Sequence, residues 1–66
     1  MHILVNDERL DCEIGLDVAT LLFRLEQNQP GIALALNQHI LPRPQWAEHV
    51  LQEGDTLLIF QAIAGG

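Results

Sequence analysis

The chain has 66 residues, of which 48% are hydrophobic, and its formal net charge is −6. A chain this short forms one small domain, and an acidic chain whose only long cationic side chains are three arginines is poorly suited to bind nucleic acid or an anionic membrane surface. A single cysteine, Cys12, excludes an internal disulfide. Because we find neither a signal peptide nor an apolar run of membrane-spanning length, we expect a cytoplasmic protein.

The N-terminal part of the chain shows the alternation of a β-hairpin. Apolar residues alternate with other residues in 1–5 and again in 9–13, and Asn6-Asp7-Glu8 between them supplies turn residues. Cys12 falls on the apolar face of the second run. We therefore interpret it as a small core residue and not as a nucleophile.

The next segment predicts one amphipathic helix. Asp17 is a good N-cap, and its negative charge favours a helix N-terminus. The apolar residues that follow recur at i, i+3, i+4 and i+7 and would form one face: Val18, Leu21, Leu22 and Leu25. We expect the helix to end near Asn28, because Pro30 cannot continue it.

The second half of the chain predicts strands separated by turns. We expect a third strand at residues 32–37, a short strand at 39–41 and a final strand at 56–62, with one helical turn at 45–50 that is anchored by Trp46. The final strand is apolar on both faces, which is typical of a strand in the middle of a sheet.

These elements together predict an α+β domain over residues 1–62, with a mixed sheet of four to five strands and one main helix packed on one face. Little of the chain then remains to cover the other face. We expect Leu4, Leu58 and Phe60 to form an exposed apolar patch there, which on so small a domain indicates a partner-binding surface. The alternative is that these side chains pack under the loop that carries Trp46.

The chain ends in Gly65-Gly66 soon after the last apolar strand. Glycine lacks a Cβ, so a glycine pair can enter a slot too narrow for any side chain. A terminal carboxylate is ionised and unreactive at neutral pH, and it must be activated before it can react. We therefore interpret residues 63–66 as a flexible tail that another protein's active site receives. A tail that merely avoids clashes is the alternative.

Several motifs occur along the whole chain: Asn6 after the first strand, Asn37 followed by Pro42-Arg43, Trp46, Glu53-Gly54-Asp55, and the terminal glycine pair. In this combination the chain resembles the sulfur carriers of thiamine biosynthesis, a family with the ubiquitin-like β-grasp fold. The terminal glycines alone are shared by many ubiquitin-like proteins, and the segment from Asn37 to Trp46 is the more specific part. The chain departs from the family at its first turn, where the glycine often found after Asn6 is absent.

The resemblance implies a carrier and not an enzyme. A partner adenylyltransferase would use ATP to convert the Gly66 carboxylate to an acyl-adenylate, and a persulfide from a cysteine desulfurase system would convert that to a thiocarboxylate. Thiazole synthase would then accept the sulfur. Gly66 would be the reacting residue, Gly65 the spacer that lets it enter a partner's active site, and Ile63-Ala64 the neck of the tail.

Other functions remain open at this point. A carrier of the same fold could serve molybdopterin synthesis or tRNA thiolation, a ubiquitin-like modifier would be joined to lysines through Gly66, and a plain interaction module would not need its terminal glycines. We expect the chain itself to bind no cofactor, since ATP would be used by the activating partner. We also expect no metal site, because no pair among its histidines has a recognised ligand spacing with a third ligand nearby. Arg43 would orient its own turn, dock a partner or be solvated.

Overall fold

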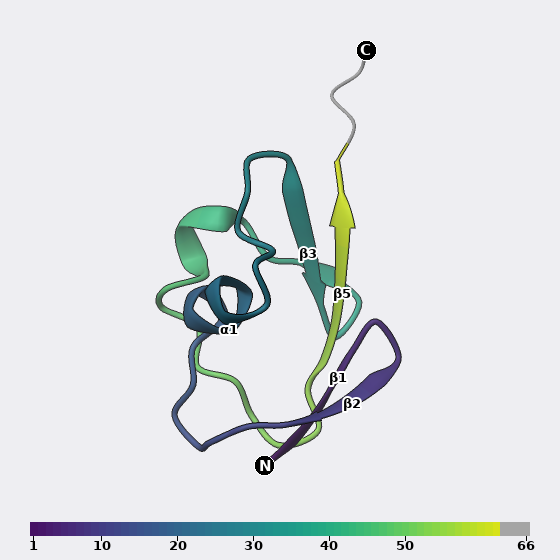
Figure 1. Ribbon diagram of the computed structural model, residues 1–66, viewed down its shortest axis with the longest axis vertical. Helices are drawn as coiled ribbons and strands as arrows, with labels where there is room; N and C mark the ends of the chain where they lie inside the picture. Colours follow the sequence, from purple (N-terminus) through teal and green to yellow (C-terminus); the bar gives the residue numbers. More distant parts are fainter. Residues whose placement is uncertain (63–66) are drawn as a thin grey trace.

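The computed structural model describes residues 1–62 as a mixed sheet with one helix against one face (Figure 1). Its elements, in chain order, are β1 His2–Val5, β2 Glu8–Asp11, α1 Val18–Arg24, β3 Ile32–Leu36, β4 His39–Ile40, the 3₁₀-helix η1 Arg43–Gln45 and β5 Thr56–Gln61. This is the α+β, β-grasp arrangement that the sequence predicts. The predicted tail, residues 63–66, lies outside the described residues, so the division of the chain after residue 62 stays a prediction.

The β1–β2 hairpin turns through Asn6 and Asp7, whose φ angles are 50° and 67°. Positive φ at both central residues is typical of a type I′ turn, whose twist matches that of the strands it joins. Asparagine and aspartate tolerate this left-handed conformation better than most residues, which explains how the turn forms without glycine. Cys12 follows β2, is partly buried and packs against the core, as predicted.

Helix α1 begins where the sequence predicts, because Asp17 caps it. The Asp17 carboxylate accepts hydrogen bonds from the Thr20 hydroxyl at 2.7 Å and from the Thr20 amide at 2.9 Å. These two bonds hold the pKa of Asp17 below its usual value. The helix buries Val18, Leu21 and Leu22 in the core.

The helix ends at Arg24, earlier than the sequence predicts. Glu26 takes a φ of 58°, and its amide and that of the next residue bond back to the carbonyls of Phe23 and Leu22, at 3.1 and 2.8 Å. This pair of bonds is a Schellman motif, which usually has glycine at its left-handed position. With glutamate there, the sequence carries no local stop signal, and the predicted end near Asn28 is wrong.

Strand β5 lies at the centre of the sheet, whose order is β2-β1-β5-β3-β4. It pairs antiparallel with the whole of β3 and parallel with the end of β1, where Leu4 lies opposite Thr56 and Val5 opposite Leu57. This two-sided pairing confirms the central position that its apolar sequence predicts. The first and last strands of the chain are therefore neighbours (Figure 1).

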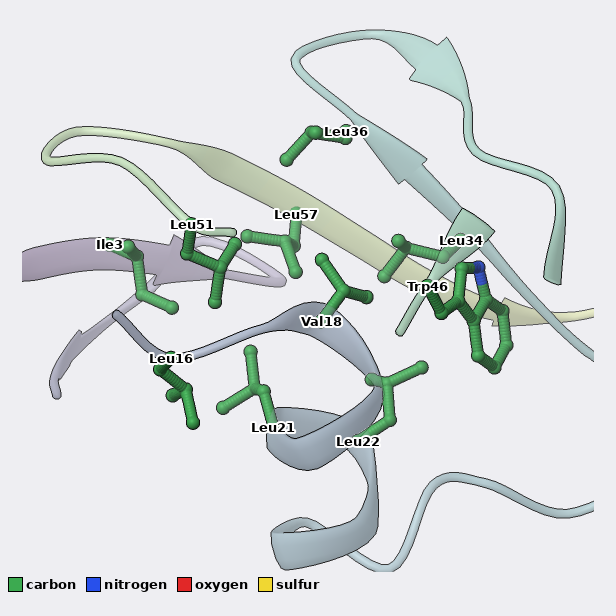
Figure 2. Close-up of a cluster of buried hydrophobic side chains, with 10 residues drawn as sticks. All are labelled: Ile3, Leu16, Val18, Leu21, Leu22, Leu34, Leu36, Trp46, Leu51 and Leu57. Atoms are coloured by element: carbon green, nitrogen blue, oxygen red, sulfur yellow. The ribbon is translucent and has the colours of Figure 1, made fainter. Parts of the chain in front are cut away.

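The core lies between α1 and one face of the sheet (Figure 2). Its buried members come from the helix, the strands and the loops between them: Ile3, Leu16, Val18, Leu21, Leu22, Leu34, Leu36, Trp46, Leu51 and Leu57. Trp46 follows η1 and donates its Nε1–H to the Leu41 carbonyl at 2.8 Å. The sequence predicts that the helical turn begins at residue 45, but η1 begins at Arg43. The earlier start is possible because the fixed φ of Pro44 suits the first turn of a helix.

Candidate functional site

The predicted reacting residue, Gly66, and the predicted neck and spacer, Ile63, Ala64 and Gly65, lie outside the described residues. The structure describes the part of the domain from which they depart. This part consists of strand β5, the turns that hold it, and the outer face of the sheet, which is the face opposite α1 (Figure 1).

Two asparagine side chains hold β5, one from each side. The Asn6 Oδ1 accepts a hydrogen bond from the Ile59 amide at 2.8 Å, beyond the point where β1 ends. On the other side, the side-chain Oδ1 of Asn37 accepts a hydrogen bond from the Thr56 backbone amide at 2.9 Å, and the Asn37 backbone amide donates one to the Thr56 carbonyl at 2.7 Å. Both asparagines stand at positive φ in two-residue turns. Each therefore forms a turn and also fixes the central strand.

Asn37 reaches a second partner, the carboxylate of Asp55. Its Nδ2 donates to Asp55 Oδ1 at 3.0 Å, while Asp55 Oδ2 accepts from the Gln52 amide at 2.8 Å. Asp55 is buried, and a buried carboxylate is costly unless its oxygens accept hydrogen bonds. The turn that precedes β5 is thereby fixed to the turn between β3 and β4.

An apolar patch is exposed on the outer face of the sheet. Leu4, Leu58 and Phe60 have exposed fractions of 39%, 53% and 36%. The register places Phe60 beside Ala33 and Leu58 beside Ala35. Since these alanines are small, the larger side chains stand above the sheet surface. The exposure agrees with what the sequence indicates, and the binding of a partner to these residues stays a prediction.

Ile40, on strand β4, belongs to the same surface, although it was not included in the patch predicted from the sequence. It is 64% exposed and lies opposite Ala35, which in turn lies opposite Leu58. Directly paired residues share a face of a sheet, so the two-residue turn Asn37-Gln38 determines that Ile40 points outward. That turn was the feature of the sequence from which the outward position of Ile40 could have been predicted. The outer-face patch is thus Leu4, Ile40, Leu58 and Phe60.

The loop that carries Trp46 does not cover this patch. Trp46 lies in the same buried cluster as Leu22 and Leu34, on the side of the sheet that faces α1 (Figure 2). The alternative in which Leu58 and Phe60 pack under this loop is therefore wrong. The helix is only seven residues long, so it cannot cover the whole inner face of the sheet, and the indole of Trp46 fills part of the space beside it.

Charged side chains lie beside the patch, on the outer face of β1 and β2. The cross-strand register places Arg9 opposite Leu4 and Asp11 opposite His2. A hydrogen bond from His2 to the Asp11 carboxylate holds the pKa of Asp11 below its usual value. An apolar centre beside a polar rim is the usual composition of a protein–protein interface.

Within residues 1–62, no three His, Cys, Asp or Glu side chains gather in a group that could hold a metal ion. His49 and Asp55 approach each other as a pair, with 4.0 Å between Nε2 and Oδ2. No helix in this part of the chain has the length and apolar character needed to cross a membrane.

Comparison with known proteins gives matches over the whole chain. The ThiS family model matches residues 3–66. The chain is 54% identical over 66 residues to the sulfur carrier protein ThiS of Escherichia coli strain K12, and the match covers 100% of both chains. It is also similar to the crystal structure of the thiamine biosynthesis protein ThiS from Geobacter metallireducens, with a TM-score of 0.85, 26% identity and 100% of both chains covered. The solution structure of a thiamine biosynthesis protein from that organism matches with a TM-score of 0.76 and 26% identity, covering 100% of this chain and 88% of the other.

Proposed function

The chain belongs to the ThiS family, and on this basis we propose that it is a sulfur carrier of thiamine biosynthesis whose reacting group is the Gly66 carboxylate. The observation that carries the proposal is the match of the full chain, including the terminal Gly65-Gly66, to a curated sulfur carrier. A small carrier of this kind is a substrate of its partner enzymes and not itself a catalyst.

The proposed chemistry begins with an unreactive carboxylate. An adenylyltransferase would join it to AMP from ATP, with release of pyrophosphate, and so create a good leaving group. A persulfide sulfur from a cysteine desulfurase system would attack the acyl carbon and displace AMP. Two electrons from a thiol would then cleave the S–S bond and leave Gly66 as a thiocarboxylate. Thiazole synthase would take the sulfur from this thiocarboxylate.

Strand β5 supports this use because it provides a fixed point from which the end of the chain departs. The strand is paired on both sides and is held by the side chains of Asn6 and Asn37. A pre-organised origin reduces the conformational entropy that is lost when the end of the chain enters a partner's active site. Gly65 and Gly66, which lack a Cβ, suit a narrow entrance.

We assign the docking of the partner enzymes to the outer-face patch. Leu58 and Phe60 lie on β5, the strand that precedes the proposed tail, so a partner that covers the patch also contacts the strand from which the tail departs. The net charge of −6 favours partners with a basic rim. We expect the carrier to work in the cytoplasm, with neither nucleic acid nor a membrane as its partner.

Mass spectrometry of the intact protein tests the proposal. The adenylating partner, ATP and a sulfur source should produce a species that is heavier by the mass difference between sulfur and oxygen, and the added mass should map to the C-terminal peptide. A variant that lacks Gly66 is the control, because it retains every residue of the described core, from Ile3 to Leu57. If the C-terminal peptide of the parent protein keeps its mass, the proposed chemistry is wrong.

A deletion strain tests the pathway. It should require thiamine or its thiazole precursor for growth. Loss of molybdoenzyme activity alone would instead indicate a carrier for molybdopterin synthesis. Covalent adducts with other proteins that survive a reductant would indicate a protein modifier.

A further inference from the structure

Arg43 joins two parts of the chain that meet near the end of β5. Its guanidinium donates hydrogen bonds to three backbone carbonyls, those of Asn28 at 3.3 Å, Gln29 at 2.8 Å and Ile32 at 3.3 Å. The same group lies over the ring of Trp46, with 4.4 Å between Cζ and the ring centroid. The side chain therefore attaches the connection between α1 and β3 to the buried indole.

Besides the Arg43 bonds, the described hydrogen bonds of this connection lie mainly at its two ends, in the Schellman motif after α1 and at Gly31 before β3. Residues 26–31 are all exposed to solvent. Within the connection, Gln29 Nε2 donates to the Glu26 carbonyl at 2.7 Å, and the Ile32 amide donates to the Gln29 carbonyl at 3.3 Å. An exposed connection with few buried contacts opens locally at low cost, so the Arg43 bonds are a large part of what fixes its shape.

Gly31, in the same connection, bonds to the chain where it leaves β5. Its carbonyl accepts a hydrogen bond from the Ala62 amide at 2.7 Å. Gly31 has a φ of 89°, a conformation that side-chain-bearing residues rarely adopt. Because Gly31 belongs to the connection, the direction of its carbonyl changes when the backbone of the connection changes shape. Ala62 is the last described residue before the proposed tail.

We propose that Arg43 is a positioning residue for the C-terminal end of the carrier. By holding the carbonyls of Asn28, Gln29 and Ile32, its guanidinium fixes the Gly31 carbonyl, which lies between them in the chain. That carbonyl fixes the Ala62 amide and hence the direction in which the chain leaves β5. Arg43 thus acts through bonds inside the domain and not through contact with a partner. The inference rests on the proposed function for its biological role, but its structural part is tested without sulfur chemistry.

An arginine is needed here because one group must donate to several carbonyls and also lie over the face of an indole. Guanidinium is planar, carries five N–H donors in a fixed fork and stacks on aromatic rings. Lysine has a compact ammonium that cannot do both. Arg43→Lys should therefore fall between the parent and Arg43→Met, which keeps an apolar side chain and removes every donor.

Amide hydrogen exchange measured by NMR tests the structural part. In Arg43→Met, we expect exchange at the Ala62 amide to become roughly tenfold faster, because the hydrogen bond to Gly31 opens more often. The amides of Leu4 and Leu51 serve as internal references, since they bond to carbonyls elsewhere in the domain. They should change by less than about twofold, unless the whole domain is destabilised.

Arg9→Met is the matched control for this measurement. It removes a guanidinium from strand β2, where Arg9 contacts His2 and Asp11, and it should leave exchange at Ala62 unchanged. If exchange at Ala62 in Arg43→Met rises no more than at Leu4, Arg43 stabilises the domain in general and does not position its end. The proposal would then be overturned.

The kinetics of adenylation test the functional part. With the adenylating partner, Arg43→Met should lower turnover at saturating carrier by roughly fivefold and change KM by less than about twofold, because the outer-face patch is intact and the reacting end is misdirected. Unchanged turnover would overturn the functional part. If the parent protein is itself not adenylated, the proposed function has failed, and the exchange rates still decide whether Arg43 fixes Ala62.

Discussion

Asn37 and Asp55 are joined by a 3.0 Å hydrogen bond from the amide Nδ2 to the carboxylate Oδ1, at the beginning of β5. Asn37 also accepts from the Thr56 amide, and Asp55 from the Gln52 amide. Two side chains from two different turns therefore share the task of fixing the central strand. We expect these turns to depend on one another for their stability.

Replacing Asn37 by glycine tests this dependence. Glycine accepts the φ of 49° at this position, so the turn is retained while both side-chain bonds are lost. We expect the free energy of unfolding to fall by about 1–3 kcal/mol, because the buried Asp55 carboxylate loses a donor. Urea denaturation followed by the fluorescence of Trp46 measures the change.

The neighbouring substitution Gln38→Gly is the matched control. Gln38 also has positive φ, 73°, and its side chain is exposed. Glycine should be neutral or slightly stabilising there, because it relieves a left-handed backbone at no cost in buried contacts. Equal losses of stability in the two variants would show that the turn, and not the Asn37 side chain, is responsible.

Phe60 and Phe23 allow a test of the outer-face patch. Phe60 belongs to the patch, whereas Phe23 lies on α1 and is 70% exposed. We expect Phe60→Ser to weaken binding to the adenylating partner by roughly tenfold or more, since aromatic side chains are the usual anchors of an interface. Phe23→Ser should leave the affinity unchanged. Isothermal titration calorimetry measures both, and a larger effect of Phe23→Ser would place the docking surface on the helix.

A side chain at Gly65 should block the proposed chemistry. In Gly65→Val, we expect adenylation to slow by roughly a hundredfold or more, because a branched side chain cannot follow the glycines into a narrow slot. Ala64→Gly, which removes a Cβ next to it, should retain the rate. Release of pyrophosphate measures both variants. Normal adenylation of Gly65→Val would show that the entrance is not narrow.

Glu13 and Arg24 supply a pH-dependent contribution to stability. Arg24 donates two hydrogen bonds to the Glu13 carboxylate, at 2.7 and 2.8 Å. These bonds, with one from the Glu13 backbone, lower the pKa of Glu13 from 4.5 to about 2. Because the folded-state pKa is the lower one, the pair stabilises the fold above pH 4.5, and this contribution is lost as the pH falls towards 2. The contribution is small, because both side chains are exposed to water.

An NMR titration of the Glu13 carboxyl group checks this assignment. The midpoint should lie near pH 2 in the parent and return towards 4.5 in Arg24→Met. Glu13→Gln should make the decline of stability with acid less steep in the same interval. A midpoint that stays low in Arg24→Met would mean that the backbone bond, and not Arg24, controls the pKa.

Features that depend on the residue types within one short segment could be predicted from the sequence. Asp17 starts the helix as its side chain suggests, and the two apolar faces of β5 place that strand in the middle of the sheet. The end of the helix could not be predicted, because Glu26 occupies a left-handed position where glycine is the usual signal. Its left-handed conformation accompanies the two backbone hydrogen bonds that close the helix, and glutamate itself has no preference for that conformation.

The candidate site was predicted only in part. The exposure of Leu58 and Phe60 could be predicted because little of the chain remains to cover the outer face of the sheet, whereas that of Ile40 depends on the register of a two-residue strand. Asn6 and Asn37 were noted as motif residues, but their role became clear only from the order of the strands. Each bonds to β5 from a turn far away in the sequence, and no local pattern reports such a contact.

The position of β5 also has a consequence for biosynthesis of the protein. In the sheet formed by residues 1–62, β5 alone links β1–β2 to β3–β4, and it is the last of these strands to emerge from the ribosome. A prematurely terminated chain without β5 would leave Ile3 and Leu34 without the strand that lies between their own strands. Such chains would be recognised as unfolded and degraded, so that incomplete molecules would not occupy the enzymes that need a finished one.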